Sequence, residues 1–356
     1  MLLIPRWICD SGLDKIFGRR FCTGRVGCWQ ENPGPMKKLW VVLLAGLVCF
    51  GAGAHSGFAE QTGAKPGAAS ATAANVATPA PAAAKTVATP AIWRVKGAHG
   101  TVYLFGSVHV MKPEVDWESG KVKTAFDSAD TLYLEIANLN DTAAAQPLLM
   151  QYGLDPSHPL SGKISKEDVE ALDSAVKAIG MPGETMMEPM RPWLASMMLS
   201  VLPMVKAGYS PNSGIDMALL SQTEKAKKQV KGFETMEDQI HLLADVPEAE
   251  QITMLHKDLT ELEKSTQQMN DLVAAWQKGD VEKIGSIDNE ELAQKYPAVY
   301  KRMVVDRNQR WADTLNGVLK DPATGTVFVA VGAAHLAGPD SVIKLLEKDG
   351  WTVERE

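Results

Sequence analysis

Short apolar runs and longer stretches with helical spacing follow one another over the last three quarters of the chain. The short runs are apolar or β-branched, and most are followed by glycine or a polar residue, a pattern typical of β-strands. The predicted strands are Trp93–Val95, Thr101–Val108, Thr131–Ile136, Gln229–Phe233, Thr326–Val331 and Trp351–Val353. Together they predict a central β-sheet.

The stretches between these runs carry apolar residues three to four positions apart, which is the spacing of one face of an α-helix. The predicted helices are Ser165–Ile179, Pro192–Ala207, Gly214–Lys227, Glu248–Gln277, Pro297–Leu319 and Asp340–Lys348. One clear strand interrupts the helical stretch between Asp141 and Leu319. The pattern therefore predicts an α/β (α+β) fold in which a mixed central sheet carries a large helical insertion.

The chain before Ile92 has a different pattern. Met36 is followed by two lysines, an apolar run over 39–50 and small residues up to Ala59. A basic start, an apolar core and a small-residue exit are typical of a secretory signal peptide, and the run is shorter than a membrane span requires. We therefore expect an exported protein, periplasmic or secreted, that is cleaved after Ala59 and has no stable transmembrane span in its mature form.

These patterns divide the chain into four parts. Residues 1–35 precede Met36, which can serve as the start residue, and are interpreted as a misannotated extension; the alternative is a cytoplasmic extension that holds a membrane anchor. Residues 36–59 are the predicted signal peptide. Residues 60–91 consist mainly of Ala, Pro, Thr and Gly, which bury too little apolar surface to fold, so they are predicted to be a disordered linker. Residues 92–356 are predicted to form one folded domain.

Composition excludes several function classes for this domain. All four cysteines lie before the predicted cleavage point, so the mature chain has no disulfide, no thiolate nucleophile and no cysteine metal ligand. From Ile92 onward there are 27 Lys and Arg against 39 Asp and Glu, a net charge of about −12, which argues against nucleic acid as a partner. Neither a Gly-x-x-x-x-Gly-Lys phosphate loop nor a Gly-x-Ser-x-Gly nucleophile elbow occurs.

A pseudo-repeat places two histidines after two similar strands. Residues 100–109 are Gly-Thr-Val-Tyr-Leu-Phe-Gly-Ser-Val-His, and residues 325–335 are Gly-Thr-Val-Phe-Val-Ala-Val-Gly-Ala-Ala-His. Each begins with Gly-Thr-Val, continues as an apolar strand and ends in Gly-x-x-His. Glycine at this point lets the backbone turn sharply and approach a ligand closely, so each unit can direct an imidazole into a crevice.

Two further predicted strands end in an acid, at Glu135 and Glu234. If the four strands run parallel, both acids and both histidines emerge at the carboxyl edge of the sheet, where open α/β sheets bind ligands. The two imidazoles together with a carboxylate would form a three-ligand set for Zn²⁺, Mn²⁺, Co²⁺ or Fe²⁺ that leaves positions open for water. Such a metal lowers the pKa of its water and polarises a carbonyl, which permits hydrolysis without a thiol or serine nucleophile.

These residues also have structural interpretations. A buried histidine that bonds to backbone explains a single Gly-x-x-His equally well, but two units on matched strands favour a site. Glu135 follows apolar residues in its strand, where an unpaired carboxylate is costly, so it needs a metal or a cation. Glu234 has a competing role as part of the N-cap region of the helix that begins at Met236.

Two further groups of residues have both a functional and a structural interpretation. Arg307 and Asn308 can donate hydrogen bonds to an oxyanion or a substrate carboxylate, whereas the local sequence by itself favours a solvated helix face with Trp311 packed inward. Eight methionines fall between Met181 and Met217. They could line a peptide groove or bind copper, but their helical spacing favours ordinary core packing.

Taken together, these motifs resemble the TraB/GumN family, which is related to the Tiki-type metalloproteases and more distantly to erythromycin esterase and ChaN-like proteins. The resemblance covers the whole predicted domain. It rests on Leu104-Phe-Gly-Ser-Val-His109, Tyr133-Leu-Glu135, Arg191-Pro-Trp193, Ser213-Gly-Ile-Asp216, Gly232-Phe-Glu-Thr235 with Gln239, Arg307-Asn308 with Trp311, and Val331-Gly-Ala-Ala-His335. The resemblance implies a metal centre of His109, Glu135 and His335, with Arg307 and Asn308 nearby.

We therefore expect an exported metal-dependent hydrolase, peptidase-like, in which the two histidines and Glu135 hold a divalent ion of Mn, Co or Zn. Its substrate would be a peptide or another small molecule. Glu234 is the reserve ligand or general base, and Arg307 and Asn308 stabilise developing negative charge. The alternative is a noncatalytic accessory protein of envelope polysaccharide assembly or export, because some members of the family are associated with polysaccharide export without an assigned reaction.

Overall fold

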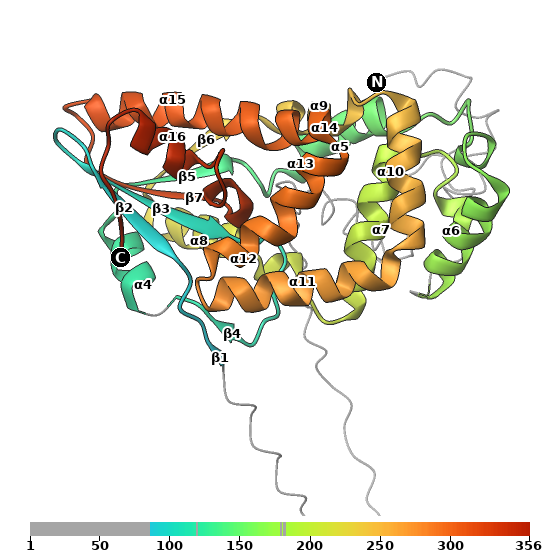
Figure 1. Cartoon of the computed structure of the whole chain (residues 1–356), viewed down its shortest axis with the longest axis horizontal. Helices are drawn as coiled ribbons and strands as arrows, with labels where there is room; N and C mark the ends of the chain where they lie inside the picture. The colour runs from blue at the N-terminus through green and yellow to red at the C-terminus, as the bar shows by residue number, and fades with distance from the viewer. Residues whose placement is uncertain (1–85, 119, 179, 181–182) are drawn as a thin grey trace, which may run out of the picture. The chain divides into compact units, whose positions relative to one another are not determined.

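The computed structural model describes residues 86–118, 120–178, 180 and 183–356. The predicted N-terminal extension, the predicted signal peptide and most of the predicted linker lie outside the described residues. Figure 1 shows a central sheet with helices on both of its faces and a group of helices beside it. None of the described helices is long and apolar enough to cross a membrane.

A six-stranded mixed sheet forms the centre of the fold, as predicted. Its strands are β2 (Ile92–Lys96), β3 (Thr101–Ser107), β5 (Thr131–Ile136), β6 (Gln229–Glu234), β7 (Thr326–Gly332) and β8 (Val353–Arg355). Their order across the sheet is β6-β5-β7-β3-β2-β8. The first four strands in this order run parallel, whereas β2 is antiparallel to both of its neighbours. The parallel strands therefore share one carboxyl edge.

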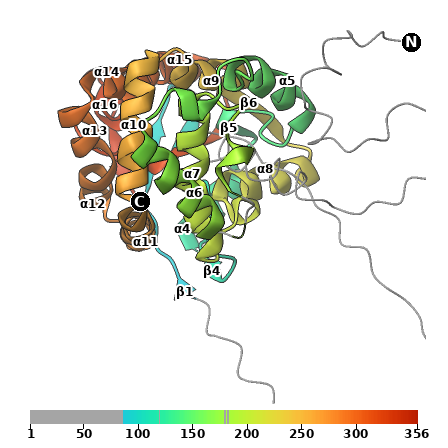
Figure 2. The ribbon, with the colours of Figure 1, turned by 90° about the vertical axis from the view of Figure 1, so that its right-hand side faces the viewer.

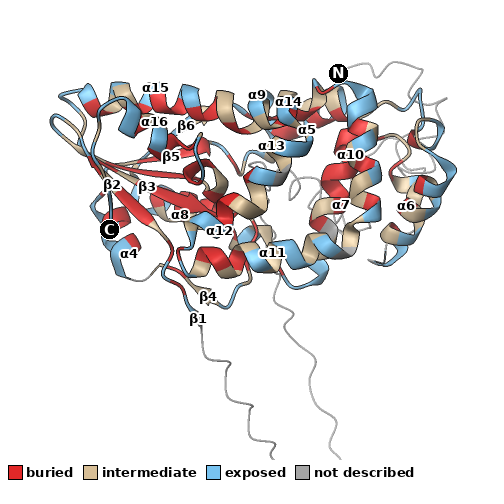
Figure 3. Cartoon of the chain, viewed as in Figure 1, coloured by how far each residue is buried: buried red, intermediate tan, exposed pale blue. Residues whose placement is uncertain are grey.

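Alternation along the parallel strands separates two cores, because successive side chains point to opposite faces of a sheet. In β3, Val102 and Leu104 face one core while Phe105 faces the other. The first core includes residues of α15 and α16, and the second includes residues of α4 and α8, so the interior strands are buried on both faces (Figure 3). These helices are α4 (Gly120–Ser128), α8 (Ile215–Ala226), α15 (Asp306–Lys320) and α16 (Val342–Lys348).

The helical insertion falls into two parts, one between β5 and β6 and one between β6 and β7. The first part contains α5 (Thr142–Gly153), η1 (Leu160–Gly162), α6 (Lys166–Ala178), η2 (Glu184–Met186), α7 (Pro192–Lys206) and η3 (Pro211–Ser213), followed by α8. The second part, before α15, contains α9 (Met236–Ala244), α10 (Glu248–Thr260), α11 (Leu262–Gln277), α12 (Val281–Gly285), the π-helical η4 (Ser286–Glu290), α13 (Glu291–Lys295), α14 (Pro297–Tyr300) and the π-helical η5 (Lys301–Val305). Helices α6, α7 and α10 pack together on one side of the sheet (Figures 1 and 2).

Several details differ from the sequence prediction. The last strand is Val353–Arg355 rather than Trp351–Val353, and the helix predicted over Pro297–Leu319 is divided into α14, the π-helical η5 and α15. The helix predicted over Glu248–Gln277 is two helices that meet at Glu261. The folded part also begins before Ile92, because β1 (Thr86–Val87) pairs in parallel with β4 (Val115–Asp116) and the small side chain of Ala88 is buried. The last residues of the predicted linker therefore belong to the fold.

Most of the methionines of the 181–217 segment lie in the core, as their spacing predicted. The buried ones are Met187, Met190, Met197, Met198, Met204 and Met217. They pack with residues of the large apolar core, and Met197 also lines a cavity of about 180 Å³. Their burial supports the predicted core packing of these methionines, while Met181 lies outside the described residues.

Candidate active site

Strands β3 and β7 are direct neighbours, and this brings the two Gly-x-x-His units together. They pair in parallel, with Ser107 opposite Gly332 at their carboxyl ends. His109 lies two residues after the end of β3, and His335 lies in η6 (Ala333–Leu336), the short turn after β7. The predicted arrangement of two parallel strands with both histidines at one edge of one sheet is therefore confirmed.

The two glycines of these units are needed for close approach. A Cβ on Gly106 would lie 3.0 Å from Cα and Cβ of Ala333, so a side chain there would push η6 away from β3. A Cβ on Gly332 would lie 3.2 Å from Oε1 of Glu135 and 3.5 Å from Nε2 of His109. The space left by Gly332 is thus where the imidazoles and the strand carboxylate meet.

Each histidine is oriented through its Nδ1 atom. Nδ1 of His109 lies 2.7 Å from Oδ2 of Asp216, and Nδ1 of His335 lies 2.6 Å from Oδ1 of Asn308. Nη1 of Arg307 donates to Nε2 of His335 at 3.1 Å. Because a guanidinium can only donate, Nε2 of His335 is the acceptor and Nδ1 carries the proton. His335 is therefore a neutral imidazole in a defined tautomer.

The carboxylate of Glu135 is buried and fully engaged. Its Oε2 accepts hydrogen bonds from Nη2 of Arg307 at 2.7 Å and from Nε2 of Gln239 at 2.9 Å. Its Oε1 accepts a hydrogen bond from the backbone N–H of Gly332 at 2.8 Å. The cation that this buried acid was predicted to need is Arg307.

Arg307 and Asn308 lie inside the protein, not on a solvated helix face. Arg307 is 3% exposed and Asn308 is fully buried. Both lie in the first turn of α15, and Asn308 Nδ2 donates to the backbone oxygen of Asp340 at 2.7 Å. The local interpretation of a solvated face is wrong for these two residues, because α15 points its first turn at the carboxyl edge of the sheet. Trp311, in contrast, is packed inward as that interpretation expected.

Glu234 lies beside this network and is also paired. Both of its oxygens lie 3.0 Å from Nε of Arg307, and Oε1 also accepts from Nη2 of Arg310 at 3.1 Å. The N-cap of α9 is Thr235, in a capping box with Asp238, so Glu234 is not the cap. Glu234 instead fixes one side of the Arg307 guanidinium.

The charges in the network are set by burial and by these partners. Burial and the adjacent Arg307 lower the pKa of His335 to about 3. Burial also acts to lower the pKa of His109, but Asp216 outweighs it and raises that pKa to about 9. Burial acts to raise the pKa of Glu135, yet Arg307 holds it well below its usual range. Without a metal, His109 is therefore a cation at neutral pH, while His335 is neutral.

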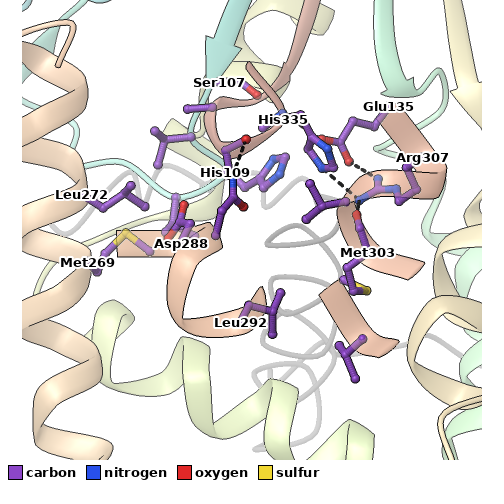
Figure 4. A pocket seen from close by; sticks show the side chains of 18 of the residues that line it. Ser107, His109, Glu135, Met269, Leu272, Asp288, Leu292, Met303, Arg307 and His335 are labelled. Atoms are coloured by element: carbon purple, nitrogen blue, oxygen red, sulfur yellow. Dashed lines mark hydrogen bonds and ion pairs between the residues drawn. The ribbon is translucent and has the colours of Figure 1, made fainter. Parts of the chain in front are cut away.

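A cavity of about 390 Å³ opens beside these residues (Figure 4). One part of its lining is polar and contains both histidines, Glu135 and Arg307. Another part is apolar and is formed by Leu243, Met254, Met269, Leu272, Leu292, Val299, Met303 and Val304. Asp288 also lines the cavity, and the cavity is therefore bounded by the sheet edge and the helical insertion.

The chemistry of the donor set fits a divalent metal. Each histidine has its Nδ1 held by an oxygen, which is how metal-binding histidines are usually oriented, and both lie at the space in front of Gly332. As they stand, however, no three His, Cys, Asp or Glu side chains of the described residues are gathered closely enough to hold an ion. Arg307 is the cation that now contacts both Glu135 and His335.

Asp216 and Asp288 were not predicted to belong to the site. The sequence signal for Asp216 was its place in Ser213-Gly-Ile-Asp216, but nothing local shows that the start of α8 reaches His109. Asp288 belongs to a segment with no predicted element, so its place on the cavity wall had no signal.

Comparison with known proteins places this site in a family. The sequence model of the TraB/PrgY/gumN family matches residues 91–355, nearly the whole described fold. The chain belongs to the TraB/PrgY/gumN family. Its match begins one residue before the predicted domain boundary at Ile92 and includes both Gly-x-x-His units.

Several curated proteins resemble this TraB/PrgY/gumN protein at low identity. An uncharacterised protein of Treponema pallidum is 24% identical over 72% of this chain and 80% of its own length. Metalloprotease TIKI1 of Danio rerio is 23% identical over 74% of this chain and 62% of its own length. Metalloprotease TIKI2 of Xenopus tropicalis is 22% identical over 74% of this chain and 59% of its own length. The matches thus span about three fifths of these two metalloproteases, and no solved structure matches the chain significantly.

Proposed function

We propose that this TraB/PrgY/gumN protein is a metal-dependent hydrolase that acts on peptide bonds. The observation that carries the proposal is the pair of histidines at one sheet edge, each oriented through Nδ1 toward the same space beside Glu135. The names of the Tiki metalloproteases support the same reaction class at about 22% identity. Export to the periplasm or beyond remains a prediction from the N-terminal sequence.

His109, Glu135 and His335 would hold the metal, an ion of Mn, Co or Zn. When bound, the ion would lower the pKa of a water molecule and polarise the substrate carbonyl. For His335 to serve as a ligand, Nη1 of Arg307 has to leave Nε2 of this histidine. For His109 to serve as one, its imidazolium has to release a proton, so metal binding and proton release are coupled.

The neighbouring residues would orient these groups and stabilise charge. Asn308 holds His335 in the tautomer whose Nε2 carries a lone pair. The guanidinium of Arg307 is fixed by Glu234 and lies over the ring of Trp311 at 4.7 Å. Because it is buried and held on one side by Glu234, it would stabilise negative charge on a substrate oxygen once its Nη1 has left His335. In this mechanism Glu234 positions Arg307, since both of its oxygens are engaged.

The test begins with the full chain purified without chelator. We expect a bound divalent metal by elemental analysis, a lower melting temperature after chelation, and hydrolysis of members of a peptide library with added Mn²⁺, Co²⁺ or Zn²⁺. His109→Ala and His335→Ala should lose the bound metal and the hydrolytic activity, while their free energy of unfolding falls by about 1–3 kcal/mol. His158→Ala is the matched control, because its side chain is 73% exposed and does not line the cavity.

One observation favours the second candidate, a noncatalytic ligand-binding accessory protein of envelope polysaccharide assembly. Arg307 already neutralises Glu135 and contacts His335, so the network is closed without any metal. On this hypothesis the purified chain contains no stoichiometric metal and melts identically with and without chelator. That result, together with metal-independent binding of a polysaccharide fragment, would replace the hydrolase with the accessory protein.

A further inference from the structure

Asp288 is the acid on the cavity wall that the proposed reaction does not use. Within the part of the chain that the structure describes, no group donates a hydrogen bond to its carboxylate or forms an ion pair with it. Burial raises the pKa of Asp288 to about 7. By contrast, Glu135 and Glu234 are paired with arginines. Asp288 is therefore the acid of the cavity that lacks a partner.

The position of Asp288 is fixed relative to the two histidines. It lies in the π-helical turn η4, and π-helical turns are frequent at functional sites. The next residue, Asn289, donates through Nδ2 to the backbone oxygen of Ala334 at 2.9 Å and to that of Ala337 at 3.2 Å. These two oxygens flank His335 in the chain. The turn that carries Asp288 is thus attached to the segment that carries His335.

The surroundings of Asp288 are largely apolar. In the view of Figure 4 it lies between Met269 and Leu272 on one side and His109 on the other. An unpaired carboxylate beside such side chains is costly, so a ligand that brings a cation gains from pairing with it. A lysine or arginine side chain has a long apolar stem and a charged head, and this combination matches an apolar wall that ends in one carboxylate.

We propose that Asp288 is a specificity-determining residue that binds the charged head of a lysine or arginine side chain in a peptide substrate. The proposal rests on the proposed peptidase function, because it names the substrate class of the same cavity. The apolar stem of the bound side chain would pack against Met269 and Leu272, and the ammonium or guanidinium would pair with the carboxylate. The acidic charge of the whole domain, about −12, favours the approach of such a peptide.

The test compares two blocked peptides that differ at one residue, lysine or norleucine, which has a similar stem without the ammonium group. Binding to the full chain is measured by calorimetry in the presence of chelator, so that no turnover occurs. We expect the lysine peptide to bind about tenfold more tightly, because its ammonium group pairs with a half-buried carboxylate. Asp288→Asn should abolish the preference and bind the norleucine peptide at least as tightly as the parent does.

Glu290→Gln is the matched control, because it removes an exposed acid two residues away and should keep the full preference. Equal affinity of the parent for both peptides, no binding of either, or an unchanged preference in Asp288→Asn would each overturn the proposal. If Asp288→Asn does not fold, the affinities of the two peptides are compared for Asp288→Ala and for the parent, and loss of the lysine preference in Asp288→Ala is then the expected result. A preference for lysine in a chain that binds no metal and cleaves no peptide would instead contradict the proposed hydrolase and leave the Asp288 subsite standing.

Discussion

The two histidines differ in charge because their Nδ1 partners differ. His109 faces the carboxylate of Asp216, which is nearly fully buried, whereas His335 faces the neutral amide of Asn308. A buried carboxylate favours an imidazolium, and an amide beside an arginine favours a neutral ring. The same side-chain type is thus set to two protonation states within one cavity.

Asp216→Asn should lower the pKa of His109 from about 9 toward the ordinary value of 6.5. Because the pKa of His109 is higher in the folded chain than in the unfolded one, protonation of His109 stabilises the metal-free fold. This contribution is complete below about pH 6.5 and is lost as pH rises through about 9. The free energy of unfolding of the parent should therefore fall between about pH 6 and pH 9, and that of Asp216→Asn should fall by less over the same range. Histidine NMR titration and denaturation with chelator present measure both effects. An unchanged His109 titration in the variant would show that Asp216 does not set this pKa.

At the scale of elements, both π-helical turns of the described chain line the cavity. Turn η4 supplies Asp288, and turn η5 supplies Met303 and Val304. A π-helical turn changes the direction of the following side chains compared with an α-helix of the same length. The second part of the helical insertion therefore follows the sheet edge closely enough to form one wall of the site.

Asn289→Ala should loosen the attachment between η4 and the segment after β7. The variant loses two hydrogen bonds to backbone oxygens. The oxygen of Ala334 still accepts from the N–H of Ala337, whereas that of Ala337 loses the donor that the described residues give it, so we expect the free energy of unfolding to fall by about 1–3 kcal/mol. Hydrogen exchange should rise in residues 333–337 but not in β3. Asn140→Ala removes a single, more exposed contact of 3.3 Å and should change neither quantity by much. Equal exchange in the two variants would contradict the anchoring role.

Trp311→Ala should destabilise the fold and also disturb the site. The ring is buried in the core under α15, stacks on Phe233, and contacts both His335 and Arg307. Loss of a buried tryptophan costs about 3–5 kcal/mol, and Arg307 loses the surface on which it rests. Urea unfolding measures the first effect and metal affinity the second. Trp351→Ala, at a partly exposed ring away from the cavity, is the control and should leave metal affinity unchanged.

The strands were predictable because their signals are local. Thr326–Val331 is an apolar, β-branched run between Gly325 and Gly332, and the observed strand ends only one residue later. The division of the predicted helix Glu248–Gln277 had no such signal, since no glycine or proline lies near Glu261. Both resulting helices pack against α7, so tertiary packing rather than the local sequence determines where the first one ends.

The sequence predicted the positions of the two histidines of the candidate site, because each follows one of two similar strands. Two Gly-x-x-His units after similar strands place His109 and His335 at one edge if the strands are parallel neighbours, and they are. The position of Asp216 depends instead on the docking of α8, whose first N–H, that of Ile215, bonds to the backbone oxygen of Val108. That contact joins residues more than 100 positions apart, so no sequence window contains it.

At the scale of the whole molecule, the acidic charge of the domain should make binding of the lysine peptide depend on salt. Raising ionic strength from about 20 mM to about 500 mM shortens the screening length from roughly 20 Å to roughly 4 Å, which weakens long-range attraction. We expect the Kd of the lysine peptide to rise several-fold and that of the norleucine peptide to stay nearly constant. The stopped-flow association rate should account for most of the change. A change confined to dissociation would contradict attraction by the overall charge.

The place of β6 in the sheet has a further consequence. This strand lies at one edge and pairs with β5 alone, and its side chains are mostly exposed or half-buried. Edge strands open locally more readily than central ones, so warming frays β6 while β3 and β7 still hold together. Because Glu234 is the last residue of β6, fraying removes one of the two carboxylates that hold Arg307 before the domain melts, while Glu135 still pairs with it. Thermal inactivation of this protein should therefore begin at lower temperature than its unfolding.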